Sequence, residues 1–283
     1  MIQDVGPELS ESEVLQPNYS PHEVGQILQF PVKSMDELAP VMAWPEFYAR
    51  FAWKQDQHVG IIGPTDSGKT NLAYNILPKR RFRTIFGLKA NDKTLLALLN
   101  KKSAIARQFG LYQEFPVWKD VDSRTAPRRL LWPKAHLNDL GAMITPSPRE
   151  LSVVAKIFAD ALAAIYADPG WCVFADDLWF MCNILKLKQI IEIFLMMARS
   201  LPVPLLVASQ RPAWIPLEVY DQSSHLLFFR DNDEVNLSRI SGIAWLSAED
   251  IIRLVANLPM YQALYLNVRT GYMCRTTAPD VWK

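Results

Sequence analysis

The octapeptide Gly63-Pro64-Thr65-Asp66-Ser67-Gly68-Lys69-Thr70 decides the fold of this chain, because it fits the pattern G-x-x-x-x-G-K-[ST] at every fixed position. The apolar run 58–62 precedes it, and a stretch of helical character, 71–77, follows it. A strand, a glycine-bearing loop and a helix form the context in which this motif binds phosphate. Backbone N–H groups of the loop and the positive end of the helix would surround a phosphate chain.

Two side chains of the octapeptide have the chemistry that a nucleoside triphosphate requires. Lys69 can reach the β- and γ-phosphates, and the Thr70 hydroxyl can bind Mg²⁺. We therefore expect residues 63–70 to bind ATP, with Mg²⁺ as the accompanying metal.

The composition limits the class of protein. Half of the 283 residues are apolar (50%), 21% are charged, and the net charge of +1 offers no overall field for nucleic acid. Cys172, Cys182 and Cys274 are widely spaced, which fits a reducing compartment better than disulfides or a zinc site. The N-terminus does not resemble a signal peptide, and charges and prolines interrupt the apolar region 190–208. We expect a cytoplasmic protein without a membrane span.

Composition also divides the chain into two parts. Residues 1–45 are acidic and contain several prolines, with Lys33 as their only basic residue besides histidine. They predict a loosely ordered arm, or an edge that packs on a neighbouring subunit. Residues 46–283 predict one phosphate-loop domain that ends in a helix and a hairpin.

Apolar runs within the second part predict the strands of a sheet. They are 58–62, 83–88, 129–132, 171–175, 203–208 and 225–229. Runs of this length without alternation are typical of strands that are buried on both faces of a parallel sheet. The stretches between them supply crossover helices. The fold class is therefore α/β, with a mainly parallel sheet flanked by helices.

Two helix starts and one hairpin are defined by local signals. Ser147-Pro148-Arg149-Glu150 has the N-cap serine, first-turn proline and third-position glutamate of a capping box. A second helix begins at Ser247 with two acids in its first turn. Residues 262–267 and 271–275 predict a hairpin.

Two carboxylates follow the apolar run 171–175. In a fold with a phosphate loop, an acid at such a strand tip can hold Mg²⁺, and a neighbouring acid can take the proton of an attacking water. We assign Asp176 to Mg²⁺ and Asp177 to the attacking water. The alternative is that the pair caps a following helix, since aspartate is favoured there, and both roles can hold together.

A glutamine follows the apolar run 203–208. Its neutral amide can donate and accept hydrogen bonds, which suits the orientation of a water near the γ-phosphate. Strand tips are also where ligands gather in an open α/β sheet. Gln210 is therefore our third candidate, after the phosphate loop and the acidic pair.

In this order the three motifs resemble the FtsK/HerA superfamily of DNA-pumping ATPases. The stretch 208–212, Ala-Ser-Gln-Arg-Pro, is similar to the family's T/S-Q-R-P sensor, and 175–177 is similar to its Asp-Glu Walker B. Asp177 is shorter than the usual glutamate. The stretch 88–92 lies where the family often has Asp-Pro-Lys-Gly, and Gly87-Leu88 stands in place of the aspartate of that motif. The resemblance covers about residues 56–245 and implies a RecA-like ASCE P-loop NTPase core.

The resemblance implies an ATPase that moves double-stranded DNA and assembles into a ring, generally a hexamer. A compact core of this size is similar to viral packaging ATPases, which implies a capsid or its vertex as a partner, and the host cytoplasm or the virion as the location. Ring ATPases complete the site with an arginine from a neighbour. The candidates are Arg199, Arg211 and Arg230, with Arg199 first by resemblance.

Two basic clusters are candidates for contact with DNA phosphates, which need clustered charge but no base readout. The first is 79–83, and the second is 101–134 with eight basic residues (Lys101, Lys102, Arg107, Lys119, Arg124, Arg128, Arg129 and Lys134). The alternative is a solvated surface, or a patch that faces the acidic arm of a neighbour.

Two other functions use the same phosphate loop. A small-molecule or nucleotide kinase would not need paired acids at one strand tip and Gln-Arg-Pro at another. A nucleotide-gated assembly protein would hydrolyse little ATP and would tolerate loss of Lys69 or of the Asp177 carboxylate.

Overall fold

The computed structural model describes residues 34–119, 121, 125–137, 146–197, 200–210, 212–241 and 247–282. The helices and strands, with η for single 3₁₀ or π turns, are α1 (Met35–Leu38), α2 (Trp44–Arg50), β1 (His58–Ile62), α3 (Lys69–Ile76), η1 (Leu77–Lys79), β2 (Arg83–Phe86), α4 (Lys93–Leu99), α5 (Ala104–Phe109), β3 (Gln113–Phe115), β4 (Arg128–Leu131), η2 (Lys134–His136), α6 (Pro148–Ala167), β5 (Cys172–Ala175), η4 (Phe180–Ile184), α7 (Lys188–Met197), β6 (Leu205–Ser209), η5 (Pro212–Trp214), α8 (Glu218–Gln222), β7 (Ser223–Phe229), α9 (Glu234–Ser241), α10 (Ala248–Ala256), β8 (Gln262–Asn267) and β9 (Met273–Thr277). All of them belong to one compact unit, Met35–Lys283.

The described strands form one nine-stranded sheet in the order β3-β4-β2-β5-β6-β1-β7-β8-β9. The strands from β3 to β7 in this order are parallel, and β8 and β9 add an antiparallel edge. Strand β6 lies between β1 and β5, and its backbone pairs with both. The carboxyl ends of these three strands therefore lie side by side at one edge of the sheet.

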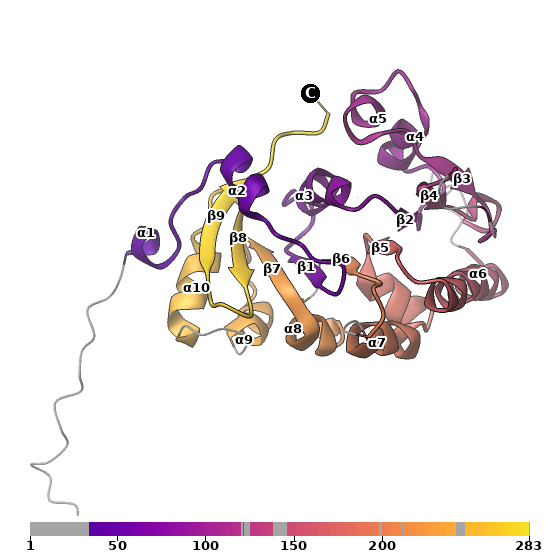
Figure 1. Cartoon of the computed structure of the whole chain (residues 1–283). Helices are drawn as coiled ribbons and strands as arrows, with labels where there is room; N and C mark the ends of the chain where they lie inside the picture. The colour runs from indigo at the N-terminus through magenta and orange to yellow at the C-terminus, as the bar shows by residue number, and fades with distance from the viewer. Residues whose placement is uncertain are drawn as a thin grey trace, which may run out of the picture. The chain divides into compact units, whose positions relative to one another are not determined.

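Helices cover both faces of the sheet. Helices α3, α4 and α5 lie on one face, and α6 to α10 lie on the other (Figure 1). The chain runs outward from β1 to β2 and β4, and then returns through β5 and β6 to β7. Right-handed crossovers that run in two directions place helices on opposite faces, so this division follows from the strand order. The α/β class and the mainly parallel sheet are confirmed.

The local signals of the sequence correspond to the elements that form. Strands β1, β5, β6 and β7 are buried along their whole lengths, as the apolar runs predict. The capping box of α6 is present, with Glu150 N donating to Ser147 Oγ at 3.2 Å and Ser147 N donating to Glu150 Oε2 at 2.8 Å. Ser147 and Glu150 thus satisfy two N–H groups at the start of the helix whose apolar side faces the core.

Two parts of the fold differ from the sequence-based expectation. Strand β3 is three residues long and only partly buried, so it has no apolar run that would indicate a strand. Residues 35–45, which composition groups with the arm, belong to the compact unit: Leu38, Ala39 and Met42 are buried, and Val41 pairs with Arg275 of β9. None of the described helices combines the length and the apolar character that a membrane-crossing helix needs.

Candidate nucleotide site

The phosphate loop connects β1 to α3, as the motif requires. Its turns need left-handed backbone at Asp66, with φ 58°, and at Gly68, with φ 104°. Gly63 is constrained by space, because a Cβ atom there would lie 2.6 Å from Phe229 Cβ. Glycine avoids the strain at Gly68 and the clash at Gly63. The two fixed glycines of the motif are therefore required for different reasons, Gly63 for space and Gly68 for its backbone conformation.

Lys69 folds back over the loop that precedes it. Its Nζ donates a hydrogen bond to the Pro64 carbonyl at 2.5 Å, and the side chain is almost fully buried. Burial lowers the pKa of Lys69 to about 8, although the carboxylates of Asp176 and Asp177 partly oppose the shift. A buried ammonium group with one carbonyl partner still has N–H groups that can donate to an anionic ligand such as a phosphate.

Besides Lys69 Nζ, a serine hydroxyl of the loop is able to make a further hydrogen bond. Ser67 Oγ is buried and finds no hydrogen-bond partner within the described part of the chain. Buried hydroxyls in folded proteins are nearly always satisfied, so an orphaned one inside a phosphate loop fits a ligand oxygen.

The hydroxyl of Thr70 and the first acid after β5 are in direct contact. Thr70 Oγ1 donates to Asp176 Oδ1 at 2.9 Å. Burial raises the pKa of Asp176, and the hydrogen bond from Thr70 opposes that rise. Among the described residues, no three or more His, Cys, Asp or Glu side chains form a metal cluster. One hydroxyl and one carboxylate fit Mg²⁺, which is held by few protein ligands together with substrate phosphates.

Gln210 lies on the other side of the loop. Gly63 N donates to Ser209 O at 3.2 Å, which extends the pairing of β1 with β6 into the loop. Thr65 Oγ1 then donates to Gln210 Oε1 at 2.8 Å. The Gln210 amide is thus joined directly to the phosphate loop.

Asp177 has the capping role that the sequence left open as an alternative. Its Oδ1 accepts a hydrogen bond from Phe180 N at 3.1 Å, at the start of the helical segment after β5. The carboxylate is half-buried and still lines the same cavity as Lys69 and Gln210. Capping and contact with a ligand are therefore compatible.

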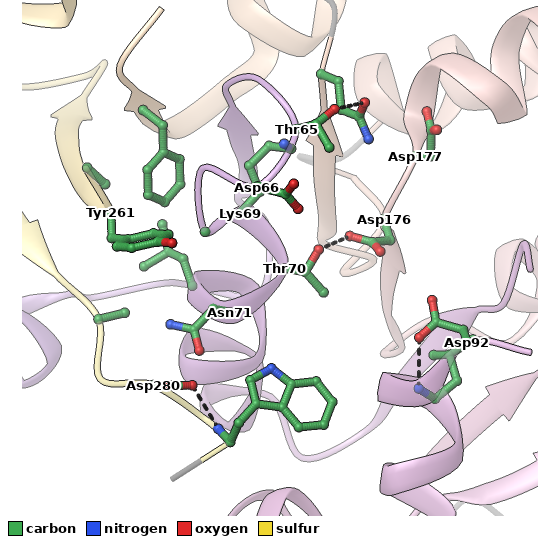
Figure 2. A pocket seen from close by; sticks show the side chains of 18 of the residues that line it. Thr65, Asp66, Lys69, Thr70, Asn71, Asp92, Asp176, Asp177, Tyr261 and Asp280 are labelled. Carbon is green, nitrogen blue, oxygen red and sulfur yellow. Dashed lines mark hydrogen bonds between the residues drawn. The ribbon is translucent and has the colours of Figure 1, made fainter. Parts of the chain in front are cut away.

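Lys69, Thr70, Asp176, Asp177 and Gln210 line one cavity of about 870 Å³. Figure 2 shows Lys69 and Thr70 in its middle, with Asp176 and Asp177 on one side and Asn71, Tyr261 and Asp280 on the other. The strand tips after β1, β5 and β6 converge on it. The volume is ample for a nucleotide, since small-molecule sites span roughly 300–1,000 Å³.

Several lining residues were not foreseen as part of the site. Phe229 and Tyr261 lie at strand ends distant in the sequence from the phosphate loop, and Asp280 and Trp282 follow β9. An aromatic residue beside a strand is ordinary in any sheet, so no local pattern identified these positions. Lys89 and Asp92 also line the cavity, in the stretch that resembles the family's Asp-Pro-Lys-Gly region.

Only one of the three candidate arginines lies among the described residues. Arg199 and Arg211 lie outside the described residues. Arg230 follows β7, is exposed, and is not among the residues that line the cavity. An arginine that acts on a neighbouring subunit's nucleotide need not line the cavity of its own chain.

Three arginines of the two basic clusters are not available as candidates for contact with DNA phosphates. Arg80, Arg83 and Arg129 are buried. Arg83 donates to Arg80 O and to Phe109 O, both at 2.6 Å, and Arg129 packs over the rings of Trp118 and Trp171. These guanidinium groups satisfy backbone carbonyls in the core, which an apolar residue could not do. Of the described members, Arg81, Lys101, Lys102, Arg107 and Lys119 remain exposed.

Comparison with known proteins places this geometry in a known fold. No protein-family model matches the sequence, and no curated protein matches it. Solved structures do match, among them the genome packaging NTPase B204 from Sulfolobus turreted icosahedral virus 2 in complex with AMP, with TM-score 0.52 and 16% identity over 79% of this chain and 98% of that one. The chain therefore shares the fold of this genome packaging NTPase.

Further structures of B204 from the same virus agree. The complex with sulfate has TM-score 0.51 and 16% identity, over 78% of this chain and 96% of that one. The complex with AMPPCP has TM-score 0.50 and 14% identity, over 79% and 98%. The similarity therefore extends over nearly the whole of those chains, and the ASCE-type P-loop core expected from the motifs is confirmed.

Proposed function

We propose that this protein is an ATPase that couples ATP hydrolysis to the movement of double-stranded DNA, as a packaging or translocation motor. The observation that carries the proposal is the meeting of three strand tips in one cavity, through the contacts Thr70–Asp176 and Thr65–Gln210 beside the buried Lys69. The fold shared with a genome packaging NTPase supports the DNA substrate.

The roles of the site residues follow from their chemistry. The loop Gly63–Thr70 wraps the triphosphate, and Lys69 exchanges its bond to the Pro64 carbonyl for phosphate oxygens. Thr70 and Asp176 hold Mg²⁺, which when bound neutralises charge on the phosphates. Asp177 accepts the proton of the attacking water, and the Gln210 amide orients that water.

The motor works as a ring, with six subunits as the proposed number. An arginine from the neighbouring subunit, with Arg199, Arg211 and Arg230 as candidates, stabilises charge on the γ-phosphate. The exposed lysines and arginines of the region 101–119 contact DNA phosphates. A viral capsid or its vertex is the proposed docking partner.

The test is the rate of ATP hydrolysis with and without double-stranded DNA, together with native mass measurement in the presence of AMPPCP. We expect DNA to stimulate turnover and the analogue to favour a ring. Lys69→Ala and Asp177→Asn should abolish turnover. Asparagine at 177 keeps an oxygen that can accept from Phe180 N, so its effect isolates the loss of the base. Asp160→Asn, on the exposed side of α6, is the matched control.

Other outcomes would contradict the proposal in distinct ways. Transfer of the γ-phosphate to a small molecule would indicate a kinase. If Lys69→Ala and Asp177→Asn still assemble as the unaltered protein does, and DNA does not change the rate of ATP hydrolysis, the protein is a nucleotide-gated assembly protein.

A further inference from the structure

We propose that the segment after β9 and the turn before β8 build a nucleobase site, in which Tyr261 and Trp282 are the aromatic walls. The proposal rests on the ATP site proposed above and adds the recognition of the base. Both residues line the cavity, and both are about half exposed, at 53% for Tyr261 and 52% for Trp282.

Tyr261 is held against the phosphate loop in a strained conformation. Its φ of 64° is left-handed, which is rare for a bulky residue. A Cβ atom placed on Gly68 would lie 3.4 Å from Tyr261 Cδ1, so the ring lies directly beside the loop. Strain at a residue that lines a ligand cavity is typical of functional positions. The strained backbone thus presents an aromatic face to the cavity.

The segment that carries Trp282 is fastened to the first turns of helix α3. Asn71 Nδ2 donates to Pro279 O at 2.9 Å, and Val281 N donates to Asn71 Oδ1 at 2.8 Å. Asn75 Nδ2 also donates to Pro279 O, and Val281 is fully buried. The backbone at 279–281 is therefore fixed relative to Thr70, which immediately precedes Asn71.

The two ends of the cavity differ in chemistry. Asp176 and Asp177 lie on one side of Thr70, whereas the ring of Tyr261 and the amide of Asn71 lie with Asp280 on the other side (Figure 2). A nucleotide whose phosphates occupy the loop must direct its ribose and base away from the γ-phosphate end. Aromatic side chains at that end can stack on any base, since every base has a π-face.

The test compares ATP with inorganic tripolyphosphate, which has the phosphates but no base. Binding of each, with Mg²⁺, is measured calorimetrically for the unaltered protein and for Tyr261→Ala and Trp282→Ala. We expect each variant to bind ATP about tenfold more weakly, which corresponds to about 1.4 kcal/mol and is within the usual range for stacking. Tripolyphosphate should bind all of them equally. Tyr261→Phe and Trp282→Phe keep an aromatic face and should retain most of the ATP affinity.

Controls separate this inference from the proposed function. Trp214→Ala and Tyr272→Ala remove exposed aromatic residues outside the cavity and should change neither affinity. Lys69→Ala should weaken both ligands, and if it weakens neither, the ATP site itself is refuted. Equal affinity of the unaltered protein for ATP and tripolyphosphate would refute the base site alone. An equal loss of both ligands in Tyr261→Ala and Trp282→Ala would also overturn it, because the two residues would then support the phosphate loop.

Discussion

The lowered pKa of Lys69 has a direct consequence for the pH dependence of nucleotide binding. With a pKa of about 8, half of the free protein carries a neutral lysine at pH 8. Phosphates require the charged form, so bound nucleotide should raise that pKa and binding should take up a proton. The affinity for nucleotide should therefore be highest well below pH 8 and should fall as the pH rises through 8.

The magnitude follows from the fraction of charged lysine. The apparent dissociation constant should be proportional to 1 + 10^(pH − pKa), where the pKa is that of Lys69 in the free protein. With a pKa of about 8, this factor is about 1.1 at pH 7, about 2 at pH 8 and about 11 at pH 9. The loss from pH 7 to pH 9 is therefore roughly tenfold, or about 1.4 kcal/mol.

The assay is calorimetric titration of AMPPCP with Mg²⁺ between pH 7 and pH 9.5, in which the Lys69→Arg variant also reports the protonation of the ligand's own terminal group. Two buffers of different ionisation enthalpy give the proton uptake, about 0.5 per site at pH 8. Lys69→Arg is the control, because its guanidinium stays charged throughout this range. An unaltered protein with constant affinity, or a Lys69→Arg variant with the same slope as the unaltered protein, would refute the reasoning.

Three further predictions concern stability. Burial lowers the pKa of His58 and His225 to about 4, so both imidazoles are neutral in the folded state at pH 7. The free energy of unfolding should therefore fall between pH 6.5 and pH 4, by up to about 3 kcal/mol for each histidine. Equal free energies of urea unfolding at pH 7 and pH 5 would contradict this. Arg83→Met should cost about 3 kcal/mol, because it leaves buried carbonyls unsatisfied, whereas the exposed Arg81→Met should change the free energy of unfolding by less than about 0.5 kcal/mol. Ser147→Ala should destabilise the protein by about 1 kcal/mol through loss of the α6 cap, and an unchanged thermal midpoint would show that the cap is dispensable.

Much of the fold could be predicted from short segments. The phosphate loop, the buried strands and the capped helix α6 depend on residues that are near one another in the chain. Glycine geometry, apolar runs and N-cap hydrogen bonds act over a few residues, so their signals are visible without tertiary structure. The same locality explains why the partly buried strand β3 was not foreseen.

The position of the basic side chains depended on packing. Arg80 and Arg81 are adjacent and chemically identical, yet Arg80 is buried and Arg81 is exposed. Charge in a sequence favours the surface, but a guanidinium with several carbonyl partners can be buried. The carbonyls that accept from Arg83 include Phe109 O, which lies 26 positions away in the chain, so no local pattern could indicate them.

By itself, the sequence determined that a phosphate loop, an acidic strand tip and a glutamine strand tip exist, because each motif is contained within one strand and its following turn. Only the tertiary structure decided that these tips meet, since the insertion of β6 between β1 and β5 brings Gln210 to Thr65 and Asp176 to Thr70. It also decided that Tyr261 and Trp282, far along the chain, complete the cavity. The physical reason is that hydrogen bonding between strands and the packing of side chains join segments that are far apart in the chain. Such contacts leave no pattern in the local sequence.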